Sequence, residues 1–166
     1  NHIISQSSLN GQYIAKRTGG AEAIDSVIES DVHIKQNICE IDVNRSLGGK
    51  TIRYSLGSIC ADDNYFLLAF TRFDNDNRAY LSVADYISCL MNMWNELDIL
   101  YSGRPIVMPL LGSGITRLKN EMSAQELLNE LIWTYRASRV RFSSSLTIVI
   151  PEVMKKQITL FDVGKE

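Results

Sequence analysis

Two closely spaced glycines follow an apolar run in the second half of the chain. The run is Ile106-Val107-Met108, and the stretch after it is Pro109-Leu110-Leu111-Gly112-Ser113-Gly114-Ile115-Thr116-Arg117. Glycine lets the backbone approach a ligand closely and turn its N–H groups toward an anion, and a helix that begins directly afterwards adds its N-terminal dipole. Backbone amides at Ser113–Thr116 could therefore hold a pyrophosphate, with Arg117 as a cation within reach of a phosphate. A tight turn between a strand and a helix explains the same glycines equally well.

Two better-known phosphate loops do not fit this stretch. A Walker loop needs Lys and Ser or Thr after its last glycine, but Ile115 follows Gly114. A dinucleotide loop needs a third glycine where this chain has Arg117. The sequence therefore disfavours an NTPase and a nicotinamide-dependent dehydrogenase.

Few other residues have the types and spacing of catalytic groups. His2 and His33 have no partner at ligand spacing, so no Ser–His–Asp triad is predicted. Cys39, Cys60 and Cys89 are an odd count without a C-x-x-C spacing, which indicates neither a disulfide framework nor a zinc site and favours a reducing cytoplasmic setting. We therefore expect no catalytic residue, no metal and no resident cofactor.

Composition and charge are those of an ordinary globular domain. The chain has 166 residues, of which 45% are hydrophobic and 22% charged, and its formal net charge is −2. This length predicts a single domain over residues 1–166, and this charge gives no global field that would attract nucleic acid. No apolar stretch approaches the roughly 20 residues that cross a bilayer. The abrupt start predicts a fragment excised from a longer protein.

Strands and helices are expected to alternate along the chain. The predicted strands lie at Val32/Ile34, Ile41/Val43 and Ile52/Tyr54 and over 65–70, 106–111, 146–150 and 158–161, after a short strand and polar turn over 1–11. A short helix is predicted over 21–29. Capping-box patterns at Ser82/Asp85 and Ser123/Glu126 predict two long helices. Together these elements imply an α/β fold, a three-layer α/β/α domain with a mixed sheet.

The long helices have apolar stripes that predict their buried faces. In the first helix the stripe is Tyr86, Ile87, Leu90, Met91, Trp94 and Leu97. In the second it is Leu127, Leu128, Leu131, Ile132 and Tyr135. Both stripes are expected to pack in the core.

Ligands of α/β sheets bind beyond the carboxyl ends of the strands. The glycine loop lies at that edge in the predicted arrangement, together with the Ser5–Gly11 turn and the segment after the 65–70 strand. Phe73 could provide an aromatic platform there, and Asp74 a carboxylate for ribose hydroxyls. A loop of alternating Asp and Asn is more often only a solvated turn, and this alternative carries more weight.

Segments spread over nearly the whole chain carry a resemblance to a known family. They are Ser8-Leu9-Asn10-Gly11-Gln12-Tyr13-Ile14, Phe66-Leu67-Leu68-Ala69-Phe70-Thr71-Arg72-Phe73-Asp74, Ala79-Tyr80-Leu81-Ser82, Leu90-Met91-Asn92-Met93-Trp94, and Gly103-Arg104-Pro105 through Leu118. Together they resemble the macro-type domain of the membrane-associated Thoeris antiphage effector. The glycine loop is also similar to the pyrophosphate loop of macro domains at large.

The resemblance implies a macro fold and a sensor role. The implied ligand is a nucleotide signal that a partner TIR-domain enzyme makes from NAD on infection, and that resembles ADP-ribose joined to histidine. The residues implied at the ligand are Ser8, Leu9, Phe73, Asp74 and those from Gly112 to Arg117. Transmembrane helices outside this chain would place the full-length protein in the bacterial inner membrane and this domain in the cytoplasm. Homo-oligomerisation stays open.

Two departures from the family bear on activity. A strand and an Asn/Asp-containing loop are expected before Ile3, so the adenine-side contacts cannot be assigned. The Asn-Asn-Gly-Gly type loop of hydrolytic macro domains is also missing, and Ser7-Ser8-Leu9-Asn10-Gly11 stands in that region. This favours binding without turnover. The alternatives are an ADP-ribosyl hydrolase, a plain ADP-ribose-binding macro domain, and a structural interaction domain in which the glycine turn is only a turn.

The glycines provide a direct test of the loop. Valine at Gly112 or at Gly114 is expected to abolish nucleotide binding, because a branched side chain restricts φ and fills the space of the phosphate. From the sequence, either change is expected to destabilise the unliganded fold only modestly.

Overall fold

The computed structural model describes residues 6, 8–44, 49–74, 78–114, 118 and 121–163. The helices are α1 (Leu9–Lys16), α2 (Gly20–Ser30), α3 (Val32–Lys35), α4 (Val83–Leu100) and α5 (Ala124–Ser138), with the short 3-10 helices η2 (Glu152–Gln157) and η3 (Leu160–Asp162). The strands are β1 (Ile38–Glu40), β2 (Arg53–Tyr54), β3 (Ile59–Asp62), β4 (Tyr65–Leu68), β5 (Arg72–Phe73), β6 (Ala79–Tyr80), β7 (Ile106–Pro109) and β8 (Leu146–Val149).

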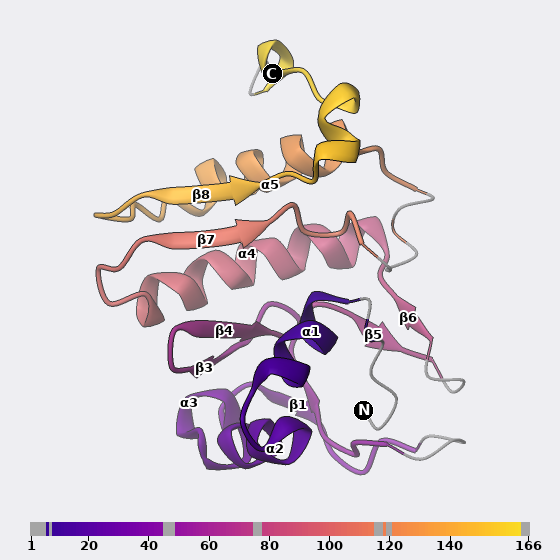
Figure 1. The fold of residues 1–166 in the computed structure, drawn as a ribbon, viewed down its shortest axis with the longest axis vertical. Coiled ribbons are helices and arrows are strands. Elements are labelled where there is room, and N and C mark those ends of the chain that lie inside the picture. Colours follow the sequence, from indigo (N-terminus) through magenta and orange to yellow (C-terminus); the bar gives the residue numbers. More distant parts are fainter. Residues whose placement is uncertain are drawn as a thin grey trace.

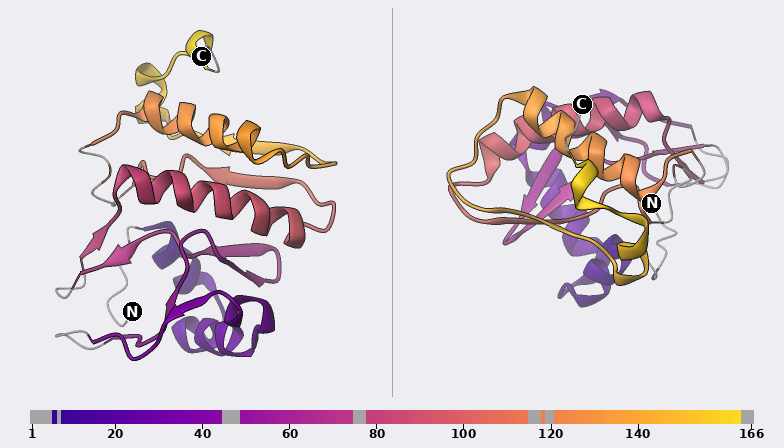
Figure 2. Two further views of the ribbon diagram at one scale, coloured as in Figure 1. Left: turned by 180° about the vertical axis from the view of Figure 1, so that it is seen from behind. Right: turned by 90° about the horizontal axis from the view of Figure 1, so that it is seen from above.

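The strands pair both ways, as a mixed α/β fold requires. Strands β1–β2, β3–β4 and β5–β6 are antiparallel hairpins, and β7–β8 is a parallel pair in register from Ile106↔Leu146 to Pro109↔Val149. Within the described residues these ladders form four separate two-stranded sheets and do not join into one continuous sheet. Helices α4 and α5 lie together on one side of the strands, and α1 and α2 on the other, which gives the three layers predicted from the sequence (Figures 1 and 2).

The core is centred on the contact between α4 and α5. Of the predicted stripes, Tyr86, Leu90, Trp94 and Leu97 of α4 and Leu127, Leu128 and Leu131 of α5 are buried. Ile87, Met91, Ile132 and Tyr135 are only partly buried. The buried faces include Cys89, Met93 and Thr134 instead. Thr134 is accommodated because its hydroxyl accepts a hydrogen bond from the Trp94 indole N–H at 3.1 Å.

The helix starts follow the predicted capping patterns. The Ser123 side chain accepts from the Glu126 N–H while the Glu126 carboxylate accepts from the Ser123 N–H, a complete capping box. At the start of α4, Ser82 accepts from the Asp85 N–H at 3.1 Å. These caps satisfy backbone donors that a helix start otherwise leaves unpaired.

Several predicted strands are wrong. Val32 and Ile34 lie in helix α3, which begins because the Asp31 carboxylate accepts from the His33 N–H at 2.8 Å and the Ile34 N–H at 3.2 Å. The apolar positions at 41 and 43 follow β1 instead of forming it. The predicted strand over 158–161 overlaps the 3-10 helix η3, and the Thr159 N–H donates to the Gln125 side chain at 2.7 Å in place of a strand neighbour.

Several elements, among them α1, β3, the β5–β6 hairpin and η2, have no counterpart in the predicted pattern. Helix α1 occupies a segment that was expected to begin as a polar turn, and β3 precedes the turn at Asp63–Asn64. Helix α1 is short and weakly apolar, and Ser8 starts it by accepting from the Gly11 N–H at 3.0 Å. The predicted strand at the beginning of the chain falls on residues 1–5, outside the described residues.

Candidate functional site

The glycine turn lies where β7 ends, as predicted. Leu110 continues the parallel ladder by donating its N–H to the Val149 carbonyl at 3.0 Å, and the chain then reverses. The Ser113 hydroxyl donates to the Leu110 carbonyl at 2.6 Å, while the Ser113 N–H approaches the same oxygen at 3.4 Å. Gly112 has a φ of 85°, in the left-handed region that favours glycine. The start of the loop is therefore a closed, hydrogen-bonded turn.

Gly112 faces the core. A Cβ atom at this position would lie 2.9 Å from Leu127 Cδ2 and 3.0 Å from Leu118 Cδ2, closer than carbon atoms normally approach. Both leucines are buried, so they have little room to move aside. The expectation that a valine here is only modestly destabilising is therefore wrong, because both the positive φ and the packing require glycine.

Gly114 faces solvent. It is exposed, and a Cβ atom at this position would meet no atom of the described residues within 4 Å. This position therefore leaves space next to the backbone, as a close ligand approach requires. The two glycines that look equivalent in the sequence have different surroundings.

The hydroxyl of Tyr86 forms a hydrogen bond that connects α4 to the turn. This side chain is fully buried. Its hydroxyl donates one hydrogen bond that is shared between the Leu111 carbonyl oxygen at 3.1 Å and the Leu127 carbonyl oxygen at 3.3 Å. Burial raises the pKa of Tyr86 well above its usual range, so the phenol keeps its proton as a donor. Tyr86 thus joins α4, the turn and α5. Its place in the core was predicted, but its hydrogen bonds to the turn were missed. A tyrosine in an apolar stripe was the available signal, since a buried phenol needs a partner.

A cavity of about 290 Å³ adjoins the turn. Its lining combines the turn with the start of α5 and with η2, and consists of Ser113, Met122, Ser123, Ala124, Leu127, Val153, Met154 and Gln157. Figure 1 shows η2 next to the carboxyl end of β8, on the side toward which β7 and β8 point. The cavity therefore has the turn and a helix N-terminus at one wall and apolar side chains at another. A site at η2 was not predicted, because a short 3-10 helix leaves no clear periodic pattern in the sequence.

The other predicted site residues lie on two separate elements. Ser8 is the N-cap of α1, and Leu9, 64% exposed, lines a different cavity between α1 and the β3–β4 hairpin. Phe73 ends β5, and the Asp74 carboxylate accepts from the Arg78 N–H at 2.8 Å within the β5–β6 hairpin. This contact gives Asp74 the turn role that was the alternative to ligand binding. The β5–β6 hairpin lies on the same side of the molecule as the ends of β7 and β8 (Figures 1 and 2). Contact of these residues with a ligand stays a prediction.

The rest of the predicted loop falls on Ile115, Thr116 and Arg117, which lie outside the described residues. Among the residues that are described, no group of three or more His, Cys, Asp and Glu could hold a metal ion. His33 has a structural partner, since its Nε2 lies 2.8 Å from the Glu96 carboxylate. No helix in the described part is long and apolar enough to span a membrane.

Comparison with known families identifies the class as a macro domain, in agreement with this three-layer α/β arrangement. The matching family is described as Thoeris protein ThsA, Macro domain, and the match extends over residues 1–151. The chain belongs to this family. The resemblance predicted from the sequence is thereby confirmed.

A curated relative gives the same result. The chain is 41% identical over 164 residues to Thoeris protein ThsA of Bacillus amyloliquefaciens (strain Y2), which is 96% of this chain and 54% of that protein. The chain thus spans about half the length of this relative. The likeness covers the glycine turn, both long helices and the parallel strand pair.

Proposed function

We propose that this chain is the sensor domain of a Thoeris defence effector and binds an ADP-ribose-derived nucleotide. The observation that carries the proposal is the exposed Gly114 in a hydrogen-bonded turn whose Ser113 lines one cavity together with Ser123 and Ala124 at the start of α5. Backbone N–H groups and a helix dipole at such a point favour a pyrophosphate. Membership of the ThsA macro-domain family supports a role in signal sensing.

The adjoining cavity suits the remainder of a nucleotide. Met154, Val153 and Leu127 offer apolar surface for a ring, while Ser113 and Gln157 offer hydrogen-bonding groups to sugar hydroxyls. The proposed ligand surface also includes the residues that were predicted from the sequence, namely Ser8, Leu9, Ile115, Thr116 and Arg117. Phe73 and Asp74 are proposed at the distal group of the ligand, so Phe73→Ala should weaken a base-modified ADP-ribose more than plain ADP-ribose.

The proposed signal is ADP-ribose joined to histidine, made from NAD by a partner TIR-domain enzyme. The domain is proposed to bind this signal without cleaving it and without a resident cofactor, and to act on the membrane only through regions outside this chain. Release of free ADP-ribose needs an activated water, and such catalysis needs a positioned base. The turn instead offers a serine hydroxyl that already donates to a carbonyl.

A thermal-shift series tests this proposal. NAD, ADP-ribose, cyclic ADP-ribose and histidine-linked ADP-ribose are added to the domain, and the last is expected to raise the melting temperature most. At 100 times its dissociation constant a ligand that binds only the folded state adds about 2.7 kcal/mol. Chromatography of the mixture should return the ligand intact. Catalytic release of free ADP-ribose would establish a hydrolase instead, and no shift with any nucleotide would leave the turn a structural element.

A further inference from the structure

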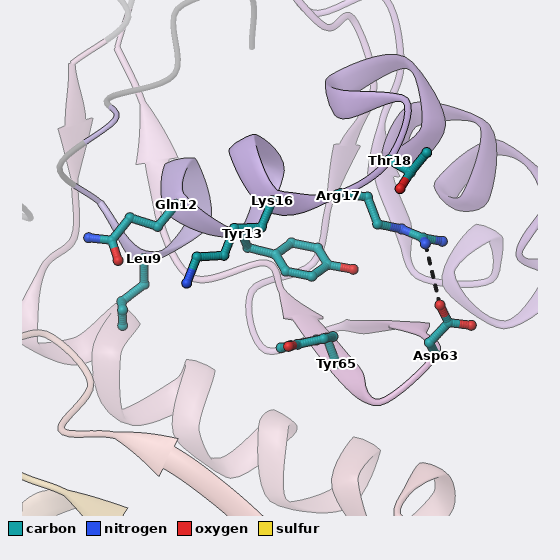
Figure 3. A pocket seen from close by; sticks show the side chains of 8 residues that line it. All are labelled: Leu9, Gln12, Tyr13, Lys16, Arg17, Thr18, Asp63 and Tyr65. Carbon is teal, nitrogen blue, oxygen red and sulfur yellow. Dashed lines mark ion pairs between the residues drawn. The ribbon is translucent and has the colours of Figure 1, made fainter.

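A second cavity lies between α1 and the turn that joins β3 to β4 (Figure 3). Its volume is about 390 Å³, within the range of small-molecule pockets. It is lined by Leu9, Gln12, Tyr13, Lys16, Arg17, Thr18, Asp63 and Tyr65. None of these residues belongs to the glycine turn.

A buried carboxylate fixes one wall of this cavity. Asp62 of β3 is 3% exposed and accepts from Arg17 Nε at 3.0 Å and from Arg17 Nη2 at 2.8 Å. It also accepts from the hydroxyl of Tyr13. Arg17 pairs in addition with Asp63 at 3.4 Å. The Tyr13 ring and the Arg17 guanidinium are therefore held in place before any ligand arrives, and the charge of Arg17 is already compensated.

Two tyrosine rings form the apolar surface. The ring centroids of Tyr13 and Tyr65 are 4.6 Å apart with an interplanar angle of 44°. Tyr65 is 58% exposed although it stands at the start of a strand, so much of its ring is available to a further planar group. Figure 3 shows both rings at the cavity, with Tyr13 projecting from α1 above Tyr65.

Lys16 is the lining residue whose positive charge is available to an anionic ligand, because the charge of Arg17 is compensated by Asp62 and Asp63. It is exposed, lies in the last turn of α1, and has no ion pair with any residue that the structure describes. Figure 3 shows its side chain reaching toward Gln12 and Leu9, along the cavity from the Tyr65 ring. An ammonium group and an amide thus stand beside an aromatic surface, which is the pairing that a ring with an acidic substituent requires.

We propose that this cavity is a second ligand site, which takes a planar aromatic anion of the size of a nucleoside monophosphate. The ring packs against Tyr65 and Tyr13, and the acidic group lies at Lys16. The same chemistry could come from a free nucleotide or from one end of a larger nucleotide held at the glycine turn. Leu9 is the one lining residue that is also proposed at the ADP-ribose ligand, and the other lining residues come from the α1 segment and the β3–β4 hairpin, which favours the free nucleotide.

Adenosine monophosphate is the probe, followed in 1H–15N spectra of the full chain. Saturable shifts are expected at the amides of Gln12, Thr18 and Asp63. Tyr65→Ala should weaken this binding roughly tenfold or more, whereas Tyr65→Phe should retain it, because the ring and not the hydroxyl makes the stack. Lys16→Gln should weaken binding of the monophosphate roughly two- to fivefold and leave that of adenosine unchanged.

The glycine turn provides the matched control. Gly114→Val should leave the shifts at Gln12, Thr18 and Asp63 intact even where it abolishes ADP-ribose binding, so the failure of one site is distinguishable from failure of the other. Absent shifts at these amides, or equal affinity in Tyr65→Ala and the unmodified chain, would overturn the proposal. Loss of the shifts in Gly114→Val would make the cavity an extension of the turn and would overturn it as a separate site.

Discussion

The residues of the glycine turn divide into those that shape it and those that leave it open. Gly112 and Tyr86 shape it, since one permits the positive φ against the core and the other donates to the Leu111 carbonyl. Gly114 leaves it open. The sequence gives both glycines the same appearance, so only the direction in which a side chain would project separates their roles.

Gly112→Val and Gly114→Val should therefore differ in stability. At Gly112, strain at positive φ and overpacking against Leu118 and Leu127 together should cost about 2–5 kcal/mol. At Gly114, an added side chain meets none of the described residues and should change stability by about 0.5 kcal/mol or less. Urea unfolding measures both. Folded Gly114→Val should fail to respond to ADP-ribose in a thermal shift, and unchanged affinity in that variant contradicts the binding turn.

How far the site could be predicted depended on local signals. The turn was predictable because glycine spacing and a preceding apolar run are local in sequence. Its contact with Tyr86 was not, because residues 86 and 111 come together only when α4 packs against the turn. The role of Asp74 was easier to predict, because its contact with Arg78 is local in sequence. A solvated turn already had more weight there than a ligand contact.

At the scale of elements, the caps decide where the long helices begin. The Ser123–Glu126 capping box starts α5, and Ser123 lines the same cavity as Ser113 of the turn. Ser82 starts α4 directly after β6. The two caps are similar in chemistry but differ in their distance along the chain from the candidate site.

Ser123→Ala and Ser82→Ala form a matched pair of variants. Each should lower the free energy of unfolding by about 1 kcal/mol, because a backbone donor in the first turn loses its partner. Ser123→Ala should weaken ADP-ribose binding more than Ser82→Ala does, since fraying of α5 disturbs the wall of the cavity directly, whereas Ser82 affects the turn only through Tyr86 in the first turn of α4. Chemical denaturation and calorimetric titration give the two readings. Equal weakening of binding by both variants would point to a general loss of stability.

Elements with strong periodicity or caps were predicted well, and short ones were not. The stripes of α4 and α5 and the apolar runs of β4, β7 and β8 are long enough to show their period. The pair Val32 and Ile34 is too short, because alternation over three residues also fits one turn of helix. The Asp31 cap is the local feature that favours α3.

At the scale of the whole molecule, several ionisable groups are held neutral by the fold. The pKa values of Cys60, Cys89 and Tyr13 are raised to about 12, and burial is the largest cause in each case. In the unfolded chain thiols and phenols titrate near their usual values, about 8.5 for cysteine and about 10 for tyrosine. The folded protein therefore holds protons that the unfolded chain releases in alkaline solution.

Stability should fall as the pH rises from about 9 toward 12. Below this window both states keep these protons and the contribution is constant. Within it the unfolded state binds fewer protons, so the free energy of unfolding decreases by up to about 1.4 kcal/mol per pH unit for the buried thiol of Cys89. The contribution of the partly exposed Tyr13 is smaller, because solvent screens its interactions. Urea midpoints at pH 8 and pH 10.5 measure the loss. Cys89→Ala should reduce the slope, whereas Cys39→Ala, at an exposed position, should leave it unchanged. A slope unaffected by Cys89→Ala would contradict this account.

The layered arrangement was predictable because alternation of strands and capped helices allows few architectures. The division of the strands into separate pairs was not, because pairing partners far apart in sequence leave no local pattern. Helix α1 and the second cavity share this difficulty, since Tyr13 and Tyr65 meet only across the folded chain.

The hydrogen bond from Tyr86 to the turn also affects the expected rate of ligand association. Hydrogen bonds within the chain itself, independent of any ligand, hold Leu110 to Ser113. A ligand that binds this turn thus meets that part already formed, and its association needs no slow rearrangement there. The observed rate should then rise in proportion to ligand concentration without reaching a plateau. A ligand whose contacts are confined to this preformed part of the turn would then bind at a rate limited by diffusion.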